Sequence, residues 1–219
     1  NLIVEIDGPE VPILDGSAAP YVRLLTRAGI ANQSAPRRYL KVRKPIEVSE
    51  RDSCIRVFPS RHLQISYAID FEHPSIPYQE FRMTLSPARY QREVAAARTF
   101  CRLEDVQRLR EMGLGRGGSL NNAVVVSRDG LLNGGLRFRD EFVRHKVLDL
   151  LGDLFLAGFP LLGHIVAYRA GHSLHTRLVR KLISTGDAWD FALQNGLPAD
   201  SVPLPAPMER PVLVGGAIS

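Results

Sequence analysis

The chain has 219 residues, 45% of them hydrophobic, which is enough for one large domain with a substantial core. Its net charge of +5 comes mostly from scattered arginines without an RNP-like, helix-turn-helix or zinc-finger pattern, so we expect no nucleic-acid binding. No apolar run reaches 18 residues, no signal-peptide pattern occurs, and Cys54 and Cys101 form no CxxC pair. A reduced, cytoplasmic protein without a transmembrane segment is therefore expected.

The first part of the chain predicts a strand, a turn and a helix. Residues Leu2 to Ile6 alternate and include β-branched side chains, which is typical of a strand. Asp15-Gly16-Ser17 supplies a turn and an N-cap, and the apolar spacing that follows predicts a helix ending at Gly29. The polar stretch from Ala31 to Arg38 is interpreted as a linker.

The middle of the chain predicts an antiparallel sheet followed by a helix. Short connections rich in Pro and Ser separate four expected strands, which run from Tyr39 to Val48, Cys54 to Phe58, His62 to Phe71 and Phe81 to Leu85. Ser86 and Pro87 predict the N-cap and first residue of a helix that continues to about Ala97.

The remainder alternates helices and strands. Helices are expected from Leu103 to Met112, closed by Gly113, from Arg139 to Gly158, from the cap Ser173 to about Ile183, and from Asp187 to Gln194. Strands are expected from Asn122 to Ser127 and from His164 to Ala170. The proline-rich stretch from Leu197 onward is expected to be loosely ordered.

The helix from Arg139 to Gly158 is apolar on most sides but carries His145, Asp149 and Asp153. Spacing of four residues places these three side chains along one edge of the helix. Burying unpaired carboxylates costs several kcal/mol each, so a cation, another histidine or water is expected beside them. The alternative is an edge that reaches solvent. His172, in a tight turn after a strand, is a further candidate, because side chains at such turns are often functional. The alternative is a surface residue, which a single loop histidine more often is.

Five segments in a fixed order carry a family resemblance: PEVPILDGSAAPYV (9–22), IDFEHP (69–74), AARTF (96–100), EFVRHKVLDLLGDLFLAG (141–158) and AYRAGH (167–172). Together they resemble the UDP-3-O-acyl-N-acetylglucosamine deacetylase family, zinc amidases of lipid A synthesis, from the first residue to about Ala206. The resemblance implies an α+β fold, with a two-layer β-α-α-β domain over 36–206 and an inserted βαβ-like unit at about 100–132. Residues 1–35 would be the last strand and helix of a similar, truncated first domain plus a linker, and 207–219 a flexible tail.

The resemblance also implies a catalytic centre. Its helix motif places two Zn²⁺ ligands at His145 and Asp149, while Asp153 would orient His172 as the acid that protonates the leaving amine. Thr99 would contact the developing oxyanion.

Substrate-binding positions follow from the same motifs. Lys146 would face the phosphate side and Asp70 with Phe71 the uridine end, while Arg169 stands where the family often has Lys. Phe100 belongs to the substrate-binding motif that contains Thr99. An acyl-chain passage is assigned to Leu103, Val106, Gly118, Ala123 and Val125.

One departure limits these expectations. The family's TxEHLxAAL motif, which supplies a general base and a third zinc ligand, does not occur in this sequence. We therefore expect a fragment with weak zinc binding and little turnover. Its complete parent would be a monomeric enzyme of Gram-negative bacteria, with at most peripheral contact with the inner membrane, acting on UDP-3-O-acyl-N-acetylglucosamine. A non-catalytic module that binds a nucleotide sugar or an acyl chain is the alternative.

Overall fold

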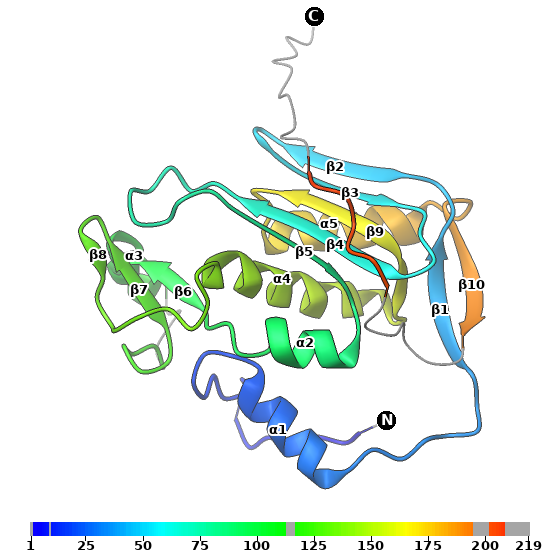
Figure 1. Ribbon diagram of the computed structural model, residues 1–219, viewed down its shortest axis with the longest axis horizontal. Helices are drawn as coiled ribbons and strands as arrows, with labels where there is room; N and C mark the ends of the chain where they lie inside the picture. Colours follow the sequence, from blue (N-terminus) through cyan, green and yellow to red (C-terminus); the bar gives the residue numbers. More distant parts are fainter. Residues whose placement is uncertain (1, 9, 113–116, 195–201, 209–219) are drawn as a thin grey trace, which may run out of the picture.

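A mixed seven-stranded sheet with two helices on one face forms the larger part of the protein in this computed structural model, which describes residues 2–8, 10–112, 117–194 and 202–208 (Figure 1). The predicted α+β class is confirmed. The sheet consists of β1 (Arg37–Val42), β2 (Ile46–Glu50), β3 (Ser53–Phe58), β4 (Leu63–Ile69), β5 (Gln79–Thr84), β9 (Leu161–Tyr168) and β10 (Trp189–Gln194). The helices are α1 (Ala19–Ala28), α2 (Pro87–Glu93), α3 (Leu103–Glu111), α4 (Glu141–Leu154), the 3₁₀ turn η1 (Phe155–Ala157) and α5 (His172–Ser184).

Strand β9 is the centre of this sheet. It pairs antiparallel with β3, parallel with β4, and over a short parallel stretch with β1. Both of its edges are therefore occupied, and its side chains are mostly buried. At Gly163 a Cβ atom would lie 3.0 Å from methyl groups of Val42 and Val57, so the close strand packing requires glycine there.

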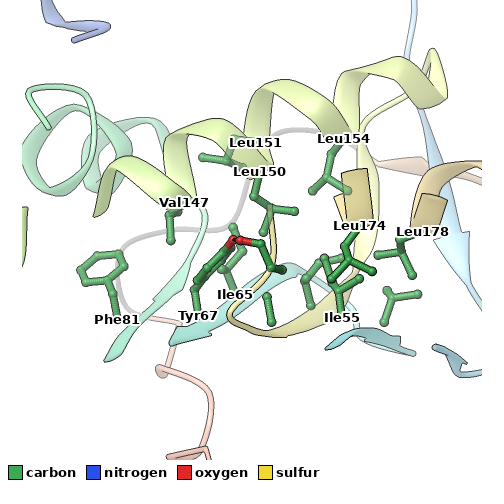
Figure 2. Close-up of a cluster of buried hydrophobic side chains, with 14 of the residues drawn as sticks. Ile55, Ile65, Tyr67, Phe81, Val147, Leu150, Leu151, Leu154, Leu174 and Leu178 are labelled. Atoms are coloured by element: carbon green, nitrogen blue, oxygen red, sulfur yellow. Dashed lines mark hydrogen bonds between the residues drawn. The ribbon is translucent and has the colours of Figure 1, made fainter. Parts of the chain in front are cut away.

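Helices α4 and α5 contact each other and cover neighbouring strands of the sheet, α4 over β4 and β5, and α5 over β2 and β3. Figure 2 shows Leu150 and Leu154 of α4 and Leu174 of α5 facing Ile65 and Ile55 of the sheet. Burying a side chain of this size contributes about 1.5–3 kcal/mol. This packing fixes the rotation of α4 and hence the direction of its polar edge.

A smaller sheet of β6 (Phe100–Arg102), β7 (Val124–Ser127) and β8 (Gly130–Leu131) lies beside the start of α4 (Figure 1). β6 and β7 are parallel and α3 connects them, so this part is a βαβ unit. It corresponds to the inserted unit expected at about 100–132, and part of its glycine-rich loop, 113–116, lies outside the described residues.

Two predicted elements are wrong. Residues 2–6 form no strand, because no described strand pairs with them, and Ile3 is 87% exposed. The stretch expected as a helix from Asp187 instead forms β10, which pairs antiparallel with β1 along its whole length. Trp189 and Phe191 lie two residues apart with ring centroids 5.2 Å from each other. This alternation suits a strand, and pairing with β1 outweighs the weak helical spacing.

Several predicted boundaries also differ. The strand expected from Tyr39 to Val48 is two strands, β1 and β2, since the chain turns at residues 43–45. α2 ends at Glu93 rather than near Ala97, and α5 begins at His172 with Gly171 as its N-cap residue. No helix among the described residues has the length and apolarity needed to cross a membrane.

Residues 202–208 follow β5 rather than being loosely ordered. The hydroxyl of Thr84 donates to Pro203 O at 2.7 Å, Arg82 donates to Pro205 O at 2.9 Å, and Met208 N donates to Glu80 at 3.1 Å. Three alternate residues on one face of β5 thus hold this segment.

Candidate metal and catalytic centre

The polar edge of α4 brings His145 and Asp149 together, as their spacing predicts. His145 Nε2 is 3.3 Å from Asp149 Oδ1, and Lys146 Nζ is 2.9 Å from Asp149 Oδ2. Burial alone would raise the pKa of Asp149, but hydrogen bonds and charge from His145 and Lys146 hold it well below its ordinary value. The site therefore contains an ionised carboxylate in direct reach of an imidazole nitrogen.

The ring of His145 is fixed by its other nitrogen. Nδ1 is 3.0 Å from the carbonyl oxygen of Ala97. A carbonyl can only accept, so Nδ1 carries a proton, which leaves Nε2 as the ring nitrogen that can bind a metal. Metal-ligating histidines usually have this arrangement, in which the far nitrogen donates to a carbonyl or carboxylate.

The third residue of the edge, Asp153, binds two histidines rather than one. Nδ1 of His172 and Nδ1 of His175 donate to Asp153 Oδ2 at 2.7 and 2.8 Å. His175 is fully buried, and burial lowers its pKa to about 4. Its Nε2 lies 3.0 Å from the hydroxyl of Tyr67, which donates to Ala170 O at 2.7 Å.

His175 is not among the residues predicted from the sequence, although the sequence contains a signal for it. It lies three residues after His172 on α5, so both rings occupy one face of the helix. The burial that makes His175 part of the network depends on packing of α5 against α4 and on the contact of His175 with Tyr67 of β4.

Asp153, His172 and His175 also form a possible donor set, with their ligand atoms within 4.8 Å of one another. Both Nδ1 atoms, however, address a single carboxylate oxygen at hydrogen-bonding distance. A cation bound here would need lone pairs on these two Nδ1 atoms, whereas their distances to the carboxylate oxygen favour N–H donors at both. The cluster is therefore a hydrogen-bond network, and it leaves Nε2 of His172, a side chain that is 66% exposed, 3.9 Å from Asp149 Oδ2.

A cavity of about 590 Å³ adjoins this edge. Five residues predicted to bind substrate line it: Asp70, Phe71, Phe100, Lys146 and Arg169. The ring centroid of Phe100 lies 5.7 Å from that of Phe71 and 6.3 Å from that of His145, so aromatic contacts connect the cavity to the histidine. The structure thus brings together residues that are far apart in the sequence.

Charged groups at the rim of this cavity are already paired. Arg169, which has a left-handed backbone with φ of 51°, contacts Asp52 at 2.7 Å and Glu72 at 3.0 Å. Asp70 accepts a hydrogen bond from the hydroxyl of Tyr168 at 3.3 Å. An anionic ligand would have to compete with these carboxylates for Arg169.

Thr99 is held by its backbone between two segments. Its N–H donates to Gly16 O and its carbonyl accepts from Val124 N, both at 2.8 Å. It follows Ala97 by two residues and is therefore close in the chain to the carbonyl that fixes His145.

The residues assigned to an acyl passage lie in or next to the small sheet. Leu103 and Val106 belong to α3 and Val125 to β7, while Gly118 and Ala123 lie in the connection between them. These five positions do not line the 590 Å³ cavity, and their role stays a prediction.

Comparison with known proteins adds the decisive observation. A sequence profile of UDP-3-O-acyl N-acetylglycosamine deacetylases matches residues 1–184. The chain belongs to this family. A UDP-3-O-acyl-N-acetylglucosamine deacetylase of Myxococcus xanthus is 50% identical over 192 residues, which are 87% of this chain and 61% of the relative. One of Acidithiobacillus ferrooxidans is 47% identical over 194 residues, 87% of this chain and 64% of the relative.

The predicted resemblance to the deacetylase family is confirmed by these matches. The chain spans 61% and 64% of the length of these two relatives.

Proposed function

We propose that this chain carries residues for zinc-dependent hydrolysis of the N-acetyl group of UDP-3-O-acyl-N-acetylglucosamine in lipid A biosynthesis. The supporting observation is that, in a member of the deacetylase family, the Asp149 carboxylate lies 3.3 Å from His145 Nε2 and 3.9 Å from His172 Nε2. The reaction adds water across the amide, breaks its C–N bond and releases acetate and the free amine.

The donor set suits zinc. Zn²⁺ binds imidazole nitrogens and ionised carboxylates. His145, whose other ring nitrogen is hydrogen-bonded to a carbonyl, and the ionised Asp149 would therefore hold the ion. When bound, zinc supplies a Lewis acid and lowers the pKa of a water ligand toward about 7.

His172 supplies the proton for the leaving nitrogen in this proposal. Asp153 holds its Nδ1–H, which turns Nε2 toward the edge of α4 where Asp149 lies. An imidazole that is oriented by a carboxylate can donate a proton from Nε2 as the C–N bond breaks. Thr99 would donate its hydroxyl to the carbonyl oxygen as charge develops there, a contact worth about 3 kcal/mol when preorganised.

The adjoining cavity would take the nucleotide end of the substrate. Lys146 and Arg169 offer positive charge for the diphosphate, and the exposed ring of Phe71 offers a face for the base, with Asp70 beside it. Binding there would require Arg169 to exchange its contacts with Asp52 and Glu72 for phosphate oxygens. The acyl chain would lie along the β6-α3-β7 unit.

Calorimetry with Zn²⁺ and with UDP tests the proposal. The metal-free chain should bind one Zn²⁺, and His145→Gln or Asp149→Asn should weaken binding at least 10-fold. His164→Gln, at a half-buried histidine bonded to Ser66 and outside the site, is the control and should bind as the parent does. Equal zinc affinity in all four proteins would contradict the metal site. Binding of UDP without any zinc binding would favour the non-catalytic module instead.

A further inference from the structure

One peptide group lies between two side chains of α4. The carbonyl of Ala97 accepts from His145 Nδ1 at 3.0 Å, and the N–H of Arg98 donates to Glu141 Oε1 at 2.9 Å. Ala97 C=O and Arg98 N–H are the two halves of the same peptide unit. Glu141 and His145 are four residues apart, so they stack along one edge of the helix and contact this unit from both sides.

Glu141 is equipped to remain charged at this position. It is 0% exposed, and its carboxylate also accepts from Arg98 Nε at 2.9 Å, Arg98 Nη2 at 3.1 Å and Arg137 N at 2.6 Å. Burial would raise its pKa, but the bonds with Arg98 and Arg137 hold the pKa below its ordinary value. A buried, ionised carboxylate therefore accepts a hydrogen bond from the peptide group whose carbonyl binds His145.

We propose that Glu141 acts through the Ala97–Arg98 peptide group as the outer partner of the metal-binding His145. A carboxylate that accepts the N–H polarises the peptide group and makes its carbonyl oxygen a stronger acceptor. The stronger bond to Nδ1–H holds the ring of His145 in place and increases the donor strength of Nε2. Glu141 is thus a positioning residue, and this inference rests on the proposed zinc site.

The bridge also couples the metal edge to Thr99. Arg98, whose N–H is held by Glu141, directly precedes Thr99, whose N–H is held by Gly16 O. Consecutive amides are therefore fixed to α4 and to the N-terminal turn. A displacement of Glu141 would move His145 and Thr99 together.

Glu141→Gln tests the inference, because it keeps the shape of the side chain and removes its charge. We expect its Zn²⁺ affinity, measured by calorimetry, to fall 10–100-fold, as is typical when the outer partner of a metal ligand is lost. Asp140→Asn is the matched control. It removes a carboxylate one residue away that pairs with Arg144 at 2.6 Å and does not bond the Ala97–Arg98 peptide, so zinc affinity should stay at the parent value.

A second variant separates the peptide bridge from the hydrogen bonds that the Arg98 guanidinium donates to Glu141. Arg98→Lys keeps the backbone N–H, the Glu141 carboxylate and a positive charge beside it, but removes the guanidinium. It should retain zinc affinity within about 3-fold if Glu141 acts through the peptide. An affinity loss in Arg98→Lys equal to that in Glu141→Gln, or a Glu141→Gln protein that is folded and binds zinc like the parent, would overturn the inference.

NMR of the metal-free chain tests the bridge apart from the zinc site. Ring ¹⁵N shifts of His145 should report the Nδ1–H tautomer in the parent and in Asp140→Asn, and a larger share of the Nε2–H tautomer in Glu141→Gln. If the parent binds no zinc but the tautomer responds, the proposed function fails while the bridge stands. A tautomer that is indifferent to Glu141→Gln would refute the bridge itself.

Discussion

His175 and His172 donate to the same oxygen of Asp153 but occupy different environments. His175 is fully buried, whereas the side chain of His172 is 66% exposed. The buried ring is held neutral, so it supports the carboxylate without adding charge to the site. At the scale of residues, the protein thus holds the Asp153 carboxylate with one buried histidine and leaves a second histidine accessible.

The lowered pKa of His175 predicts that stability depends on pH. Its pKa falls from 6.5 in the unfolded chain to about 4, so the unfolded state takes up the proton first as pH decreases. Stability should be full above about pH 6.5 and fall by roughly 3 kcal/mol by pH 4. Urea unfolding of the parent and of His175→Asn at pH 7 and 4.5 would measure this difference.

His164 also has a pKa lowered by burial and titrates in the same range, so the informative quantity is the difference between the two proteins. The pKa of Asp149 lies well below its ordinary value, so this carboxylate adds little to the change of stability with pH above about pH 4. An equal loss of stability in the parent and in His175→Asn would show that His175 does not carry the effect.

At the scale of elements, two glycines with opposite surroundings test the packing around β9 and α4. Gly163→Ala places a Cβ 3.0 Å from Val42 and Val57 side chains and 3.2 Å from Phe58 O, so we expect a loss of about 1–3 kcal/mol from overpacking. Gly152→Ala, on the exposed side of α4 with no atom within 4 Å, should stabilise by about 0.5–1 kcal/mol. Thermal unfolding of both variants should move in opposite directions, and a neutral Gly163→Ala would contradict the close packing of β9.

At the scale of the whole molecule, the turn at Gly16 connects the N-terminal segment to the small sheet. Gly16 has φ of 80°, and a Cβ there would lie 1.9 Å from Asn122 O. Asp15 and Ser17 also bond Arg137, which leads into α4. The N-terminal turn, the βαβ unit and the central helix therefore meet around Thr99.

Gly16→Ala and Gly29→Ala separate backbone strain from this contact. Both residues have positive φ, 80° and 86°, but a Cβ atom added at Gly29 would meet no other atom within 4 Å. Strain alone costs about 1–3 kcal/mol. We expect Gly16→Ala to lose more stability than Gly29→Ala and to accelerate hydrogen exchange at the Thr99 amide, measured by mass spectrometry. Similar exchange at Thr99 in both variants would argue against the coupling.

Local sequence determined much of this protein. The spacing of His145, Asp149 and Asp153 fixes them on one helix edge, since helix geometry depends only on neighbouring residues. Most strands of the large sheet follow from short apolar runs between turn residues, and the family motifs identify the residues that line the cavity. These features are encoded within windows of a few residues.

Only the tertiary structure decided the rest. Residues 189–194 form a strand because β1, which lies far earlier in the chain, offers an edge, and His175 joins Asp153 because α5 packs against α4. The Ala97–Arg98 peptide reaches Glu141 and His145 because contacts with Gly16 and Arg137 bring its segment to α4. Such contacts join residues that are distant in the sequence. The local spacing of apolar and polar residues does not specify which distant segment supplies a hydrogen bond or a buried surface.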